Sequence, residues 1–213
     1  MAPLLRPADC CVLLIDPRRK NLDRLDPQAQ KALAQNLDIV EQALQAACVP
    51  LRLAFRAPAP DPQEWLTRVD EATPPPIHDL GNSGSSWPNS GLAAAIAGQA
   101  REALILAGFW IETSVTFIAL PALATGFDVF ILMDATPARV QDARAPAVDR
   151  LLRAGAVPTT TRQLVAEWIE ADAIASQRSA LSLLLQRTEA CHDDCTSQGH
   201  AAAISDQPRV TQT

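Results

Sequence analysis

Two residues, Asp16 and Ser114, stand where a side chain could take part in chemistry. Asp16 comes directly after the apolar run 11–15, and Ser114 ends the segment 110–114, which follows a second apolar run. A carboxylate can accept a proton, and the start of a helix presents backbone N–H groups that can hold an oxyanion. The two residues are therefore a candidate site. Asp16 could also simply cap a turn, and Ser114 could be an ordinary residue of a first helical turn.

The elements that would position these residues alternate between strands and helices. Short apolar runs bounded by turn residues predict strands at 11–15, 51–55, 77–80, 103–108, 129–134 and 157–159. Apolar residues at helical spacing predict helices at 27–47, 112–125, 146–154, 161–173 and 175–185, with a short one around 64–70. This alternation predicts an α/β fold in three layers (α/β/α), with a parallel sheet covered by helices on both faces.

Local signals set some of the boundaries. Asp26 and Pro27 are an N-cap and a first-turn proline, so a helix should begin there, and Pro146 is interpreted as the start of another helix. Pro121 should kink the helix 112–125, because it removes one backbone donor. We expect one α/β domain over 1–187. Residues 188–213 are polar and aperiodic, and we expect them to form a disordered tail.

The composition narrows the classes of function. The 213 residues carry a net charge of −6, and no basic, aromatic-interleaved stripe is present, so nucleic acid is not an expected partner. No apolar run reaches the roughly 18 residues that would cross a membrane, and the first residues do not resemble a signal peptide. Five cysteines without regular spacing do not suggest a disulfide framework. We therefore expect a cytoplasmic protein.

Longer motifs add a family resemblance. Residues 12–16 read VLLID, and 104–136 read LILAGFWIETSVTFIALPALATGFDVFILMDAT. Residues 147–167 read AVDRLLRAGAVPTTTRQLVAE, and a Ser-Trp pair stands at 86–87 ahead of Ser-Gly-Leu at 90–92. Over roughly residues 10 to 175 the chain resembles the isochorismatase-like hydrolases, also called cysteine hydrolases. The resemblance implies a Rossmann-like fold with a six-stranded parallel sheet in the order 3-2-1-4-5-6.

That family uses a catalytic triad of aspartate, lysine and cysteine. By the resemblance, the aspartate corresponds to Asp16, the cysteine to Ser114 and the lysine to Gly81. The chain's only lysines are Lys20 and Lys31, and no cysteine lies between positions 48 and 191, so no shift of the alignment restores either residue. A serine hydroxyl is a much weaker nucleophile than a thiol unless a base activates it.

Two classes of function remain open, and whether the chain is an enzyme stays undecided. The first is a hydrolase homologue that acts on, or binds, a small amide, nitrile or vinyl-ether metabolite with weak or lost catalysis. The second is a non-catalytic subunit that binds a small ligand or has a structural role in an oligomer. The resemblance also implies assembly into a homo-oligomer.

Further residues are candidates for binding a substrate by their place near Asp16 or Ser114: Trp87, Trp110, Ile111, His78 and Arg18. Arg18 could supply positive charge near Asp16. His78 is the best spare base, although a structural role is the simpler interpretation. The resemblance further implies a non-proline cis peptide bond near 110–111.

We expect no metal and no cofactor. The metal-binding branch of the family needs an Asp-x-His pattern after the second strand, and the three histidines, at 78, 192 and 200, do not supply it. The segment 191–195, with two cysteines, a histidine and two aspartates, could imitate a metal site, but no apolar segment surrounds it. Cys10 and Cys11 begin a predicted buried strand and are expected in the core.

Overall fold

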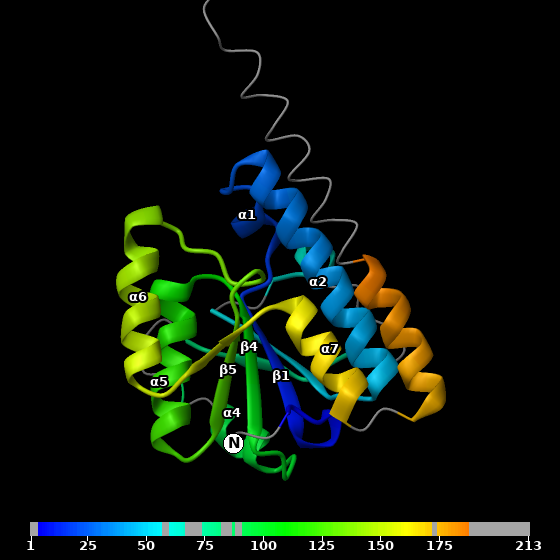
Figure 1. Cartoon of the computed structure of the whole chain (residues 1–213). Helices are drawn as coiled ribbons and strands as arrows, with labels where there is room; N and C mark the ends of the chain where they lie inside the picture. Colours follow the sequence, from blue (N-terminus) through cyan, green and yellow to red (C-terminus); the bar gives the residue numbers. More distant parts are fainter. Residues whose placement is uncertain are drawn as a thin grey trace, which may run out of the picture.

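The strands form one sheet, and all neighbouring strands are parallel (Figure 1). The computed structural model describes residues 4–56, 60–66, 74–81, 87, 91–171 and 174–187. The strands are β1 (Cys10–Ile15), β2 (Leu51–Phe55), β3 (Ile77–Asp79), β4 (Ala103–Gly108), β5 (Asp128–Leu132) and β6 (Val157–Thr159). Their order is β3-β2-β1-β4-β5-β6, which confirms the predicted six-stranded topology.

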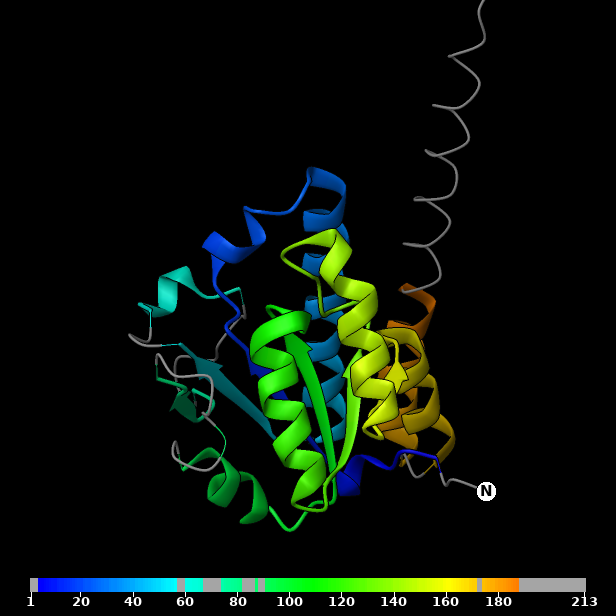
Figure 2. The same cartoon turned by 90° about the vertical axis from the view of Figure 1, so that its left-hand side faces the viewer.

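Helices cover both faces of the sheet (Figures 1 and 2). One face carries α2 (Pro27–Ala47), α7 (Thr161–Ala171) and a helix over 175–187. The other carries α4 (Leu92–Ala97), α5 (Thr116–Ala124) and α6 (Gln141–Arg153). Shorter pieces are α1 (Arg19–Leu22), the 3₁₀ turns η1 (Pro7–Asp9) and η2 (Pro62–Glu64), and the π-helical turn η3 (Ile111–Val115). No helix in the described ranges is both long and apolar enough to cross a membrane.

The two central strands, β1 and β4, are fully buried, as their continuous apolar sequences predict for strands covered on both faces. At their carboxyl ends Ile15 pairs with Gly108. Gly108 has φ 109°, and a Cβ atom there would lie 2.1 Å from the carbonyl oxygen of Ile15. Only glycine allows this approach, which brings the chain after β1 beside the chain after β4.

The predicted start of α2 is confirmed. The Asp26 side chain accepts a hydrogen bond from the N–H of Ala29 at 2.9 Å, and Pro27 is the first helical residue. The helix ends at Ala47, and Cys48 adopts the left-handed conformation that closes it. Leucines on one face of α2 bury against the sheet, as their helical spacing predicts.

Two of the longer helices begin at other residues than the sequence predicts. The segment 112–125 is not one helix, because it opens with the π-helical turn η3 before α5 begins. Helix α6 begins at Gln141 rather than at Pro146, which lies inside it. The Arg144 guanidinium donates hydrogen bonds to the carbonyls of Thr136 and Met133. These tertiary bonds anchor the first turns of the helix and offset the donor that Pro146 lacks.

Other predictions are met only in part by the described residues. The short helix predicted around 64–70 corresponds to the 3₁₀ turn η2, and 67–70 lie outside the described residues. The tail predicted for 188–213 also lies outside them. The sequence did not predict α1 or α4.

Candidate functional site

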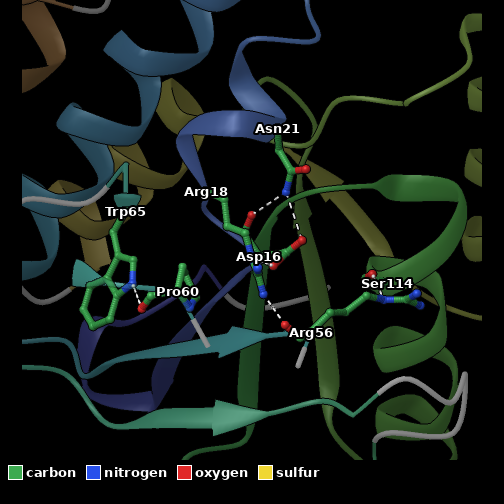
Figure 3. Close-up of polar contacts among 7 residues, drawn as sticks. All are labelled: Asp16, Arg18, Asn21, Arg56, Pro60, Trp65 and Ser114. Carbon is green, nitrogen blue, oxygen red and sulfur yellow. Dashed lines mark hydrogen bonds and ion pairs between the residues drawn. The ribbon is translucent and has the colours of Figure 1, made fainter. Parts of the chain in front are cut away.

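Asp16 directly follows β1, and donors hold its carboxylate on both sides (Figure 3). The Arg18 Nε atom lies 2.6 Å from Oδ1, and the Asn21 side-chain amide donates to Oδ2 and to the Asp16 carbonyl, each at 2.9 Å. Asp16 has φ 50°, a backbone conformation that side chains rarely adopt. Both carboxylate oxygens are thus engaged, and the side chain is held in one orientation.

Arg18 links the ends of two neighbouring strands. Its side chain is only 6% exposed, and its guanidinium carbon lies 5.6 Å from the centre of the Phe55 ring. A terminal nitrogen donates a hydrogen bond to the carbonyl oxygen of Arg56, the residue directly after β2. Arg18 therefore fixes Asp16 relative to the carboxyl end of β2.

Ser114 lies in the π-helical turn after β4 and is buried, with 5% of its surface exposed. Its Oγ atom accepts a hydrogen bond from Nε of Arg56 at 3.1 Å (Figure 3). Within the described part of the chain, no carboxylate or imidazole is hydrogen-bonded to Ser114. The contact is therefore with a cation that donates and not with a base that could accept the hydroxyl proton.

Arg56 is the residue that the sequence interpretation missed. It connects the two predicted residues: its carbonyl accepts from Arg18, which pairs with Asp16, and its side chain reaches Ser114. A signal was available, because Arg56 directly follows a strand next to β1, and ligands of open parallel sheets bind beyond the carboxyl ends of the strands.

Gly81, which the sequence resemblance aligns with a lysine, also lies just beyond the carboxyl end of its strand. Its N–H donates to Oδ1 of Asp79 at 2.7 Å, and its φ is 62°. Among the described residues beyond its chain neighbours, a Cβ atom at this position would meet no atom within 4 Å. The cation near Ser114 thus comes from the end of β2 instead of the segment after β3.

Trp110 and Ile111 lie in the turn that carries Ser114, but both side chains are buried in the core. The cis peptide bond joins Phe109 and Trp110, one bond earlier than expected. The Trp110 ring packs edge-on against Phe109, with ring centres 4.9 Å apart, in the cluster under α2 and α7. Ile111 belongs to the opposite cluster, and its N–H donates to the carbonyl of Pro137.

The structure does not bring His78 or Trp87 into the Asp16–Ser114 network. His78, on β3, has its Nε2 atom 3.1 Å from a guanidinium nitrogen of Arg52, and burial, with the Arg52 charge, lowers its pKa. Trp87 is buried with its ring edge-on to Phe127, at a centroid distance of 5.8 Å. Phe127 directly precedes β5, so this contact is at the amino edge of the sheet.

The described cysteines are free thiols and do not form a site. Cys10 and Cys11 are fully buried in β1, as predicted for core residues, and burial raises both pKa values, that of Cys10 to about 12. Cys48 is exposed. Among the residues that the structure describes, no three His, Cys, Asp or Glu side chains are arranged to hold a metal ion. The segment 191–195 lies outside those residues.

Glu112 fastens the turn of Ser114 to the segment that leads into α6. Its Oε1 atom accepts hydrogen bonds from the N–H groups of Arg139 and Val140, at 2.9 and 3.3 Å. An acidic side chain at the start of a helix is also favoured by the helix dipole. The observed bonds give Glu112 a second, tertiary role in holding the turn in place.

Comparison with known proteins places these features in a family. A sequence model described as the Isochorismatase domain matches residues 10–163. The probable hydrolase YcaC of Escherichia coli (strain K12) is 39% identical over 72 residues, which make up 34% of this chain and 35% of that protein. The match thus spans about a third of the length of this curated relative.

Solved structures share the fold over most of the chain. The E. coli YcaC gene product, reported as an octameric hydrolase of unknown specificity, superposes with a TM-score of 0.73 at 24% identity, covering 94% of this chain and 100% of that one. YcaC from Pseudomonas aeruginosa, solved with hexane-2,5-diol and covalent acrylamide, gives 0.72 at 23% identity, with 93% and 98% covered. The MAR1 ribonuclease of Caenorhabditis elegans gives 0.69 at 15%, with 87% and 93% covered.

Proposed function

The chain belongs to the isochorismatase family, and from this we propose that it is a hydrolase homologue with weak or lost catalysis. In this proposal the Asp16–Ser114 site binds a small amide, nitrile or vinyl-ether metabolite. The family's thiol is replaced by the Ser114 hydroxyl, and the family's lysine by Gly81. The site keeps the means to hold a carbonyl compound but lacks an activated nucleophile.

The hydrogen bond from Arg56 to Ser114 carries this proposal. A serine becomes a nucleophile when a base takes its proton, usually a histidine that a third group orients. Arg56 is permanently protonated and can only donate. The charge of Arg56 would stabilise a Ser114 alkoxide, but Arg56 cannot act as the base that removes the hydroxyl proton.

The state of Asp16 supports the same conclusion. Arg18 and Asn21 donate to its two carboxylate oxygens, and among the described residues no hydrogen bond joins Asp16 to Ser114. The ion pair with Arg18 and the hydrogen bond from Asn21 hold the carboxylate in one orientation. The paired Asp16 therefore suits the orientation of a ligand better than proton transfer.

We also propose that the protein is a cytoplasmic homo-oligomer. The E. coli relative is reported as an octamer, which supports assembly of this chain into copies of itself. The unpaired thiols of Cys10, Cys11 and Cys48 are consistent with a reducing compartment. The alternative, a non-catalytic subunit that binds a small ligand or has a structural role in an oligomer, shares this assembly.

Restoring the family's residues tests the proposal. Turnover of a panel of amides, nitriles and isochorismate is measured for the wild type, for Ser114→Cys, and for Ser114→Cys combined with Gly81→Lys. Because the backbone at Gly81 is in the left-handed conformation, the substitution Gly81→Lys costs about 1–2 kcal/mol of backbone strain. Unfolding curves therefore accompany the rates, and the single variant keeps the test independent of that strain.

Activity that appears only in the cysteine variants would support a scaffold that lost its nucleophile. Wild-type turnover equal to that of the cysteine variants would refute the proposal, because the hydroxyl would then be as effective as the thiol. A further comparison, Ser114→Thr, keeps a hydroxyl and adds a methyl group in a buried turn. It should be as inactive as the wild type.

A further inference from the structure

Arg56 is a cation only partly engaged by the protein around it. Its Nε atom donates to Ser114, but among the residues that the structure describes neither terminal nitrogen has a hydrogen-bond partner. The guanidinium group carries five N–H donors in a planar arrangement. With Nε directed at Ser114, the pair of terminal nitrogens at the far end of the plane remains for another acceptor (Figure 3).

The charges of the site do not balance. Asp16 is paired with Arg18 at 2.6 Å, so these two offset each other. Within the described ranges, no carboxylate lies within ion-pair distance of Arg56, which is half-buried. The Asp16, Arg18 and Arg56 group thus carries one excess positive charge, and taking a charge partly out of water without a partner is unfavourable.

The Ser114 hydroxyl adds a second donor beside this cation. A hydroxyl group offers one O–H donor and two acceptor lone pairs, and the Arg56 bond uses one lone pair. The hydroxyl proton is therefore directed away from Arg56. The terminal N–H of Arg56 that lies on the same side as Nε–H is next to this O–H donor, and the two donors together match the two oxygens of a carboxylate.

We propose that the ligand of this site carries a single carboxylate, which accepts from the terminal nitrogen of Arg56 on the Ser114 side through one oxygen and from the Ser114 hydroxyl through the other. This inference rests on the proposed function, because it names the class of small metabolite that the site holds. Arg56 is then the residue that selects acids over neutral amides. One excess positive charge suits a monoanion, since a dianion would leave a negative charge unpaired.

Calorimetric titration with matched acids and amides tests the inference at constant ionic strength. The probes are acetate and acetamide, acrylate and acrylamide, and benzoate and benzamide, with inorganic phosphate as a dianionic comparison. The proteins are the full-length wild type, Arg56→Gln, Arg56→Lys and Ser114→Ala. Arg150→Gln removes the same charge from an exposed position on α6 and serves as the matched control.

Each acid is expected to bind more tightly than its amide. Arg56→Gln should weaken acid binding by about 10- to 100-fold, the range for a lost charge-assisted hydrogen bond, and leave the amides nearly unchanged. Arg56→Lys keeps the charge but lacks the planar guanidinium donors, so its affinity for the acids should lie between those of the wild type and Arg56→Gln. Ser114→Ala should cost several-fold, and Arg150→Gln should bind as the wild type does. Thermal unfolding of each variant shows that it is folded.

Equal binding of acids and amides, or acid binding unaffected by Arg56→Gln, would overturn the carboxylate inference. If the amides still bind in that case, the proposed function stands without it. If none of the probes binds the wild type, both fail together. Tighter binding of phosphate than of every carboxylate would also overturn the inference, since it would identify a dianion site.

Discussion

The hydroxyl of Ser114 and a thiol in its place would respond differently to Arg56. A thiol ionises near neutral pH and a nearby cation favours its thiolate, whereas a serine hydroxyl stays protonated under the same conditions. The Arg56 Nε atom is 3.1 Å from the Ser114 oxygen, close enough to act on either group. The cation needed by thiol chemistry is thus present, and the thiol is not.

Ser114→Cys should therefore produce a thiolate at unusually low pH. We expect its ionisation midpoint to lie about one pH unit or more below that of the double variant Ser114→Cys with Arg56→Gln, because a neighbouring cation favours the charged form. The measurement is the ultraviolet absorbance of the thiolate as a difference from the wild type, which cancels the signals of the native cysteines.

A combination of Ser114→Cys with Arg150→Gln is the matched control, and it should keep the low midpoint. Identical midpoints with and without Arg56 would show that its guanidinium does not face residue 114 in solution. Cys10 provides a contrast within the same chain, because burial raises its pKa to about 12.

At the scale of elements, sequence patterns predicted regular pieces well and irregular ones poorly. Helix α2 begins and ends as predicted, since the Asp26 cap and the leucine spacing are local signals. The π-helical turn η3 and the early start of α6 depend on hydrogen bonds from distant residues. Glu112 and Arg144 make such bonds, and neither residue type indicates a partner from sequence alone.

In the candidate site too, residues with local sequence signals could be predicted, and a residue that depends on tertiary contacts could not. Asp16 and Ser114 could be located because strand ends and helix starts can be predicted, and Gly81 could be seen to lack the family's lysine. Arg56 was missed because an arginine after a strand is usually solvated. Only the adjacency of β2, β1 and β4 in the folded sheet brings its side chain to Ser114.

The edge strand β3 is held to β2 in part by a contact that depends on pH. Burial, followed by the charge of Arg52, lowers the pKa of His78 below its ordinary value of 6.5. A histidine whose folded pKa is depressed binds fewer protons in the folded than in the unfolded state between the two pKa values. The free energy of unfolding is therefore unaffected by His78 protonation above the unfolded-state pKa. It decreases as the pH falls from the unfolded-state pKa to the folded-state pKa.

We therefore expect the wild type to lose unfolding free energy relative to His78→Gln as the pH falls below about 6.5. Urea unfolding at several pH values for the two proteins gives the difference directly. The histidines at 192 and 200 are present in both proteins, so their contributions cancel. A difference that stays constant with pH would show that His78 is not held neutral by its surroundings.

The whole molecule keeps the family's scaffold while its reactive groups have changed. The sheet order, and the meeting of β1 and β4 beside Asp16, are those that the sequence predicted. By the resemblance, Ser114 takes the place of the family's thiol and Gly81 that of its lysine, and the structure brings a cation to Ser114 from the end of β2. Our central proposal is that these differences leave a site suited to binding.

The most direct test of that claim is turnover by the wild type against Ser114→Ala, over the panel of amides, nitriles and isochorismate. The two proteins differ by one buried hydroxyl, so any rate that needs a serine nucleophile appears as their difference. We predict wild-type rates within a few-fold of those of Ser114→Ala for every substrate. Robust wild-type turnover that Ser114→Ala abolishes would contradict the account and establish Ser114 as a working nucleophile.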